Sequence, residues 1–244
     1  MEITALSSLP ADDPRAVAMT AAIQGGDIAS LRRLLEAHPD LVNMPIANKT
    51  GVARTPVLIA TDWPGHFPQV ATTISILAEA GADVNVRLPP HPKDANCMET
   101  PLHQAASSND VAAIDALLDA GADINATGAI FTAGGPLSDA VIFANWDAAK
   151  RLVGRGADVE WWQAAALGLL DRMRTRWDAT PPPTREEITR ALWHACRGAQ
   201  RTTAEELLDQ GGDPHWVGWD GLTPVAAAGK SGNVEFLKWL RSRL

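Results

Sequence analysis

The sequence predicts an all-α fold, a solenoid of about seven stacked helix pairs joined by extended hairpin loops, some of them enlarged by insertions. Three observations support this prediction. A Gly-Ala-Asp motif recurs along the chain, an amphipathic run with paired apolar residues precedes each copy, and helix-starting dipeptides such as Thr-Pro lie further upstream. With 244 residues, 46% of them apolar, the chain can bury a substantial core.

The repeated motif defines how each unit begins and ends. Its copies are Gly81-Ala82-Asp83, Gly121-Ala122-Asp123, Gly156-Ala157-Asp158 and a weakened Gly211-Gly212-Asp213, at offsets of 40, 35 and 55 residues. Glycine adopts the left-handed conformation that ends a helix and turns the chain outward. Upstream, Thr before Pro supplies a capping oxygen and a ring with preset φ, so it begins a helix. Each unit is therefore helix, turn, helix and extended loop.

Seven units follow from these signals, and we expect them to form one domain over 1–244. In chain order, the expected helix pairs are 15–38, 55–80, 100–120, 136–155, 161–177, 186–210 and 223–243. The 40-residue offset places an insertion in the proline-rich stretch 87–97, and Pro64 with Gly65 lengthens the turn of the second unit. The pair 161–177 lacks its own Gly-Ala-Asp, and the proline-rich stretch 178–185 after it predicts an irregular joint.

The strongest unit carries a family resemblance. Residues 99–125 contain Thr-Pro-Leu-His-Gln-Ala-Ala and, further on, Leu-Leu-Asp-Ala-Gly-Ala-Asp-Ile-Asn, and they closely resemble an ankyrin repeat. The last unit, from Trp219 onward, is also similar, and looser matches cover nearly the whole chain. The resemblance implies that His103 makes a structural hydrogen bond between adjacent units. It also implies a concave groove, lined by first helices and hairpin tips, that binds partner proteins.

Carried onto matching positions, the resemblance implies a set of groove residues. They follow the small-residue pair of each first helix, with Ile23, Gln24, Ile142, Ala166, Leu167, Cys196 and Ser231 among them. Exposed aromatic side chains are enriched in binding sites, so two to four of the nine tryptophans are expected to contact a partner, whereas Trp193 and Trp239 are expected in the core. The candidate partner-binding residues are Asp62, Trp63, Ser107, Ser108, Phe143, Trp146, Trp161, Arg197, Trp219, Asp220 and Lys230.

Composition argues against several other classes of protein. A net charge of −8 disfavours nucleic acid as a ligand, and the arginine-rich stretch 171–201 is interpreted as solvated helix surface. The N-terminus has no signal-peptide pattern and no apolar run is long enough to span a membrane, so no membrane association is expected. Two distant cysteines, Cys97 and Cys196, indicate a reducing compartment and predict a cytoplasmic protein. Polar chain ends predict a monomer, and the excess of Arg over Lys with no Tyr predicts a bacterial source.

The sequence contains none of the common motifs for catalysis or for binding phosphate or metal ions. The sequence has no phosphate-binding glycine loop, nucleophile elbow, two-histidine zinc helix or calcium loop, so we expect no catalytic residue, metal or cofactor. We therefore expect a non-catalytic module that binds an unidentified protein through its groove and hairpin tips. The alternative is a small-molecule binder or enzyme with a Trp- and Arg-lined pocket in the irregular region 143–219. An enclosed pocket lined by Trp161, Trp162, Trp193 and Arg197 would favour that alternative.

Overall fold

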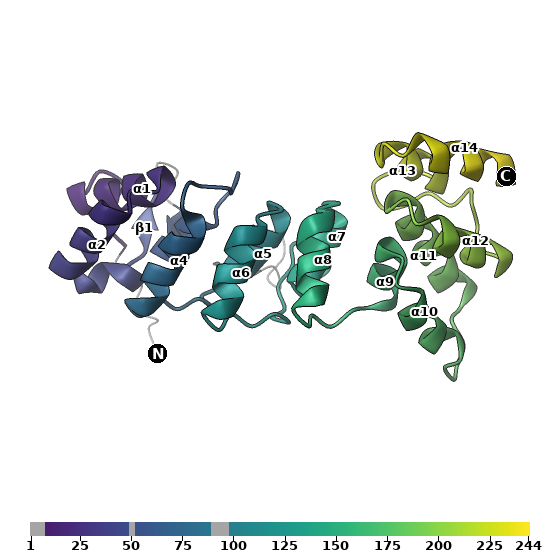
Figure 1. Cartoon of the computed structure of the whole chain (residues 1–244), viewed down its shortest axis with the longest axis horizontal. Coiled ribbons are helices and arrows are strands. Elements are labelled where there is room, and N and C mark those ends of the chain that lie inside the picture. Colours follow the sequence, from purple (N-terminus) through teal and green to yellow (C-terminus); the bar gives the residue numbers. More distant parts are fainter. Residues whose placement is uncertain (1–7, 49–51, 89–97) are drawn as a thin grey trace. The chain divides into compact units, whose positions relative to one another are not determined.

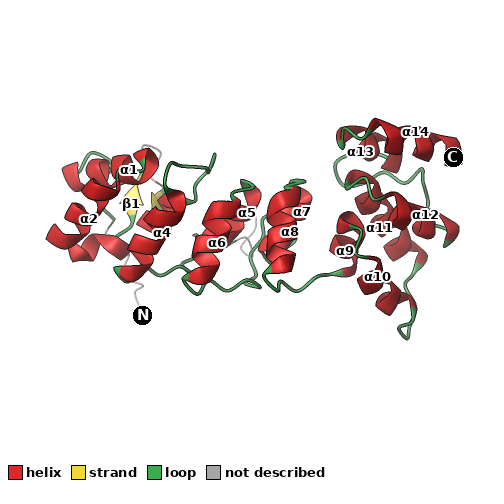
Figure 2. Cartoon of the chain, viewed as in Figure 1, coloured by secondary structure: helices red, strands yellow, loops and turns green. Residues whose placement is uncertain are grey.

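A computed structural model describes residues 8–48, 52–88 and 98–244. Within these ranges fourteen α-helices follow one another as seven pairs, which confirms the predicted helical solenoid (Figures 1 and 2). The chain divides into two compact units, unit 1 over 1–157 and unit 2 over 158–244, and the single domain over 1–244 stays a prediction. Residues 89–97, which hold Cys97 and most of the predicted insertion, lie outside the described residues.

Unit 1 contains four helix pairs and a small antiparallel hairpin that the sequence did not predict. The pairs are α1 (Pro14–Gly25) with α2 (Ile28–Ala37), α3 (Pro56–Ala60) with α4 (Val70–Glu79), α5 (Pro101–Ser107) with α6 (Val111–Asp119), and α7 (Pro136–Ile142) with α8 (Trp146–Gly154). The 3₁₀ helix Pro39–Asn43 and the strands β1 (Ile46–Ala47) and β2 (Ala53–Arg54) lie between the first two pairs. Ile46 pairs with Arg54 across the hairpin, and Leu9 bridges to Ile46 in parallel.

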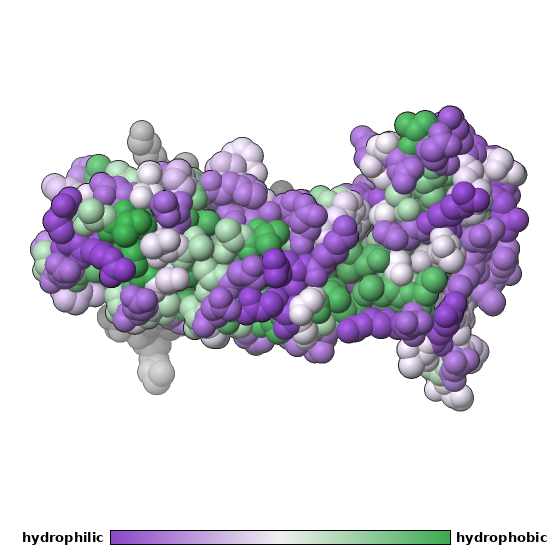
Figure 3. All heavy atoms as spheres, in the orientation of Figure 1, coloured by the Kyte–Doolittle hydropathy of each residue, from purple (hydrophilic) through white to green (hydrophobic). Residues whose placement is uncertain are grey.

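Unit 2 contains three helix pairs. They are α9 (Trp161–Leu167) with α10 (Leu170–Trp177), α11 (Arg185–Arg197) with α12 (Arg201–Asp209), and α13 (Pro224–Lys230) with α14 (Val234–Arg243). Hydrophilic side chains cover α12 on the face seen in Figure 3, as expected of an outer helix whose apolar residues point into the stack. No helix in the described ranges is long and apolar enough to cross a membrane.

Asparagine side chains join successive loops of unit 1. The Asn43 amide donates to the Gly81 carbonyl at 2.8 Å, and its oxygen accepts from the Asp83 backbone N–H at 2.9 Å. Asn85 repeats both bonds with Gly121 and Asp123 one unit later. Each asparagine thus binds the loop that follows the next helix pair, so the motif fixes the spacing of the stack as well as the end of a helix.

A buried ring nitrogen links first helices to the next hairpin in both units. His103, fully buried in α5, bonds through Nε2 to the Gly134 carbonyl at 3.2 Å, as the family resemblance implied. In unit 2, Trp193 stands at the matching position of α11 and donates from Nε1 to the Leu222 carbonyl at 2.9 Å. A Cβ on Gly218 would lie 2.5 Å from that nitrogen, so glycine makes room for the larger ring. The prediction that Trp193 belongs to the core is confirmed, since it is 1% exposed.

Candidate functional site

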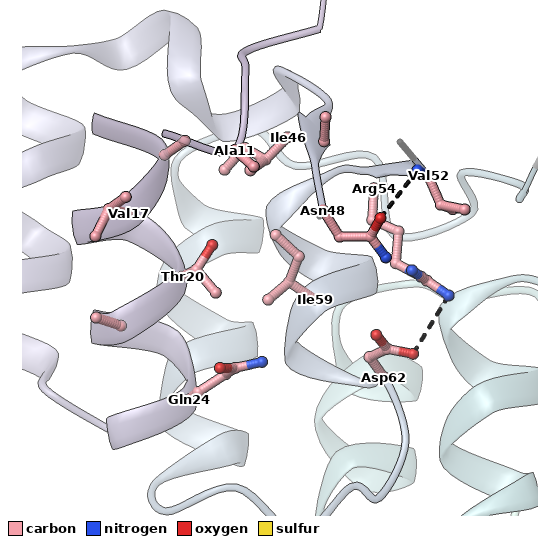
Figure 4. Close-up of a pocket in the computed structure, with 13 residues that line it drawn as sticks. Ala11, Val17, Thr20, Gln24, Ile46, Asn48, Val52, Arg54, Ile59 and Asp62 are labelled. Carbon is pink, nitrogen blue, oxygen red and sulfur yellow. Dashed lines mark hydrogen bonds and ion pairs between the residues drawn. The ribbon is translucent and has the colours of Figure 1, made fainter. Parts of the chain in front are cut away.

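A hollow of about 360 Å³ lies in unit 1 between α1, the β1–β2 hairpin and α3 (Figure 4). Its size falls within the range of about 300–1,000 Å³ typical of ligand pockets. The lining residues are Ala11, Ala16, Val17, Thr20, Ala21, Gln24, Ile46, Ala47, Asn48, Val52, Arg54, Ile59 and Asp62. Gln24 and Asp62 are two of the implied groove positions, and the hollow brings them to one surface.

The walls of the hollow are mainly apolar because small residues on α1 face the hairpin. Ile46 and Ile59 are 5% and 7% exposed and lie deep, whereas Val17 and Val52 are 53% and 42% exposed at its rim. Such a surface removes water from an inserted side chain without requiring the walls to rearrange.

The charged residues of the lining neutralise one another. Arg54 Nη2 lies 3.6 Å from Asp62 Oδ1, and both side chains are partly exposed. Asn48 is also held in place, because its side-chain oxygen accepts from the Val52 backbone N–H at 3.0 Å. The hollow therefore offers amide and hydroxyl groups but no net charge.

Beside Asp62, the lengthened turn between α3 and α4 exposes Trp63 and holds its backbone in place. The Trp63 side chain is 82% exposed, while its backbone N–H donates to Asp62 Oδ1 at 3.0 Å. Further along the turn, the His66 backbone N–H donates to Asp110 Oδ2 at 2.7 Å, and its ring Nε2 lies 2.9 Å from the Ser108 carbonyl oxygen. The turn is thus fastened to the next unit, and the indole is presented to solvent from a fixed base.

The turns after α5 and α7 carry further predicted residues. Asn145 donates from its side chain to the Ser107 carbonyl at 2.7 Å, which joins the turn after α5 to the turn after α7. At that next turn, Phe143 is 43% exposed and packs against the 60%-exposed Phe131, with ring centroids 5.8 Å apart. Trp146 is half-buried at the start of α8. The described part of unit 1 therefore has three exposed aromatic side chains, Trp63, Phe131 and Phe143, with the Ser107 turn between the Trp63 and Phe143 turns along the chain.

Unit 2 brings together three predicted residues, Arg197, Trp219 and Asp220. Arg197 Nη1 lies 3.2 Å from Asp220 Oδ2, and its guanidinium carbon is 5.4 Å from the Trp193 ring centroid and 5.9 Å from that of Trp219. Asp220 also accepts from the Leu222 backbone N–H at 3.1 Å. Arg197 and Asp220 thus fasten the hairpin onto α11, and Trp219 remains 55% exposed above them.

Trp162 is linked to this cluster through His194, whose ring centroid lies 5.0 Å from that of Trp193. Trp161 packs edge-on against Trp177 at 5.2 Å between centroids, and Lys230 is exposed at the end of α13. His194 packs against Trp162 at 4.6 Å, and burial lowers the pKa of His194 to about 3. Each of these rings packs against a neighbouring ring. Because the pKa of His194 is so low, its imidazole provides no general base near neutral pH.

A buried carboxyl pair is the main feature that sequence reasoning missed. Asp139, 1% exposed on α7, hydrogen-bonds the Glu99 side chain and accepts from the Ile130 backbone N–H. Burial, with the Glu99 charge second, raises the pKa of Asp139 to about 8, and burial also raises the pKa of Glu99. Forty residues separate the two along the chain, and no local motif marks either.

Among the described residues we looked for clustered metal ligands and for a reactive thiol. Across the parts of the chain that the structure describes, no group of three or more His, Cys, Asp or Glu residues could hold a metal ion. Burial raises the pKa of the Cys196 thiol to about 12, so the reactive thiolate is not formed near neutral pH.

Comparisons with known proteins agree with this architecture. The family model described as Ankyrin repeat matches residues 97–126. Over 69 residues the chain is 35% identical to the ankyrin repeat and KH domain-containing protein mask-1 of Caenorhabditis elegans. The match covers 28% of this chain and 3% of that relative.

Proposed function

Because this chain is an ankyrin repeat protein, we propose that it is a non-catalytic module that holds a partner protein. The surface that we propose for this contact belongs to unit 1 and comprises the first helices of its pairs and the turns that follow them. Ankyrin repeats generally mediate protein–protein interaction. The observation that supports this surface most directly is Trp63, an indole 82% exposed on a turn that the bond from the His66 N–H to Asp110 fastens to the next unit. An indole has only two side-chain torsions to order, so a tryptophan on a fixed turn offers a large contact area at a low cost in conformational entropy.

The neighbouring features extend the surface on both sides of Trp63. The hollow lies beside Asp62, and Phe143 with Phe131 adds a second exposed aromatic position. Trp219 of unit 2 remains a candidate contact in its own right, since the Arg197–Asp220 pair holds its hairpin in place.

The test uses site-specific crosslinking in the native cell. A photoreactive phenylalanine analogue in place of Trp63 should crosslink one defined protein, which mass spectrometry would identify. The same analogue in place of Val234, 61% exposed on α14, is the matched control and should not capture that protein. With the purified partner, Trp63→Ala should weaken binding at least tenfold, as expected for an aromatic hot spot. Capture of no protein at position 63, or capture of a protein that the Trp63→Ala chain binds as tightly as the original chain does, would contradict the proposal.

A further inference from the structure

The lining of the hollow constrains what it can bind. Its deep part consists of Ile46 and Ile59, and its rim includes the exposed Val17 and Val52. Of its thirteen lining residues, Arg54 and Asp62 carry charge, and they pair with each other.

This balance of charge disfavours an ionic occupant. A carboxylate or ammonium group would lose hydration against apolar walls, and Arg54 and Asp62 lie 3.6 Å apart and offset each other's charge, so the lining has no net charge to offset that loss. An aliphatic side chain loses nothing on leaving water, and it gains contact with the isoleucine and valine walls.

The neutral polar groups of the lining suit a peptide backbone. Thr20 and Gln24 lie along α1 beside the hollow, across from the hairpin (Figure 4). A hydroxyl and an amide can donate to a peptide carbonyl and accept from a peptide N–H, so they match an extended chain that passes over the hollow.

We propose that the hollow receives one aliphatic side chain from an extended segment of the partner protein, while Thr20 and Gln24 bind the backbone on either side of it. This inference rests on the proposed function of unit 1 and adds the chemistry of the anchoring residue. Recognition then combines an apolar anchor in the hollow with contacts to the nearby indole of Trp63.

Two exposed alanines provide a matched pair of variants. Ala21 lines the hollow, so Ala21→Phe fills its opening without disturbing a buried residue. Ala29 is exposed on α2 and does not line the hollow, so Ala29→Phe adds the same ring elsewhere. Val17→Glu, at a position 53% exposed, is a second variant that places a charge on the rim.

The experiment selects a random peptide library displayed on phage against the full chain, with counter-selection against the Ala21→Phe chain. We expect the enriched peptides to share one Leu, Ile or Val. Replacing that residue by Lys or Asp should weaken binding at least tenfold, as should Ala21→Phe or Val17→Glu in the chain, whereas Ala29→Phe should leave affinity within twofold. Urea unfolding of each variant checks that it is folded.

Three results would overturn the inference: a charged anchor in the enriched peptides, equal binding to the Ala21→Phe and unaltered chains, or no enrichment of peptides that distinguish them. The proposed function fails in a different way. If it is wrong, position 63 captures no protein, or the captured protein binds the Trp63→Ala chain as tightly as it binds the original. If only the inference is wrong, position 63 still captures a partner, and that partner binds the Ala21→Phe chain as well as it binds the original.

Discussion

Replacing Asp139 by Asn should remove a loss of stability that unit 1 otherwise suffers as pH rises. Asp139 has a pKa of about 8 in the folded chain because of burial and the Glu99 charge, against an ordinary value of 3.8 for an aspartate. Above pH 4 the folded state therefore retains a proton that the unfolded state has released. A group with a raised pKa stabilises the fold most at low pH, and the benefit is lost as pH rises through 8.

The size of the effect follows from the proton balance. One retained proton costs about 1.4 kcal/mol for each pH unit, and integration from pH 7 to 8.5 with a pKa near 8 gives on the order of 1 kcal/mol. His103 and His194 have lowered pKa values, about 4 and 3, because of burial, and they act with the opposite sign mainly below pH 6.5. They are common to the original chain and the Asn variant, so their contribution cancels in the comparison.

Urea unfolding at pH 7, 7.5, 8 and 8.5 provides the measurement. The original chain should lose roughly 1 kcal/mol more than Asp139→Asn across this range, because the Asn amide stays neutral and can still bond to Glu99 and Ile130. Asp147→Asn, at an exposed position on α8, is the control and should follow the original chain. Equal pH dependence in Asp139→Asn and the original chain would refute the assignment of a proton to this pair.

Two further predictions concern packing. Gly26 has φ +66°, and an added Cβ would strike the Pro68 carbonyl, so Gly26→Ala should lower the free energy of unfolding by about 2 kcal/mol in the same urea titration. Gly25 is the matched control, because it lies in a helix and its added Cβ would meet open space. Gly25→Ala should therefore raise the free energy of unfolding by up to about 1 kcal/mol. Trp193→Phe should cost about 2–3 kcal/mol, because it removes the bond to Leu222 and leaves a void, and a loss below 0.5 kcal/mol would show that this bond contributes little.

The sequence predicted the helix pairs well because their signals are local. Thr223 before Pro224 caps and starts a helix, and the glycine of each Gly-Ala-Asp ends one, within a few residues of chain. The pair over 161–177, which lacks the motif, was still found from its amphipathic pattern and is confirmed as α9 and α10.

The hollow and the carboxyl pair could not be predicted in this way. The hairpin that forms one wall has two residues in each strand, too few for a period-two pattern, and its register depends on Leu9 far upstream. Glu99 and Asp139 meet through the stacking of α5 and α7, which no spacing rule reveals. For the predicted contacts Arg197 and Asp220, the pattern identified the positions but did not show that the two side chains bind each other. Their role in partner binding stays a prediction.

The indole at position 193 limits how this protein can be rebuilt by exchanging units. In repeat proteins each unit contacts its neighbours alone, which favours engineering by substitution of consensus units. A consensus unit would bring histidine to position 193, and the space that Gly218 leaves for the larger ring would then be empty. Residues 193 and 218 lie in successive units, so a graft must carry both. The smallest transferable piece therefore runs from the start of α11 through the hairpin to Leu222, and graft boundaries belong outside that segment.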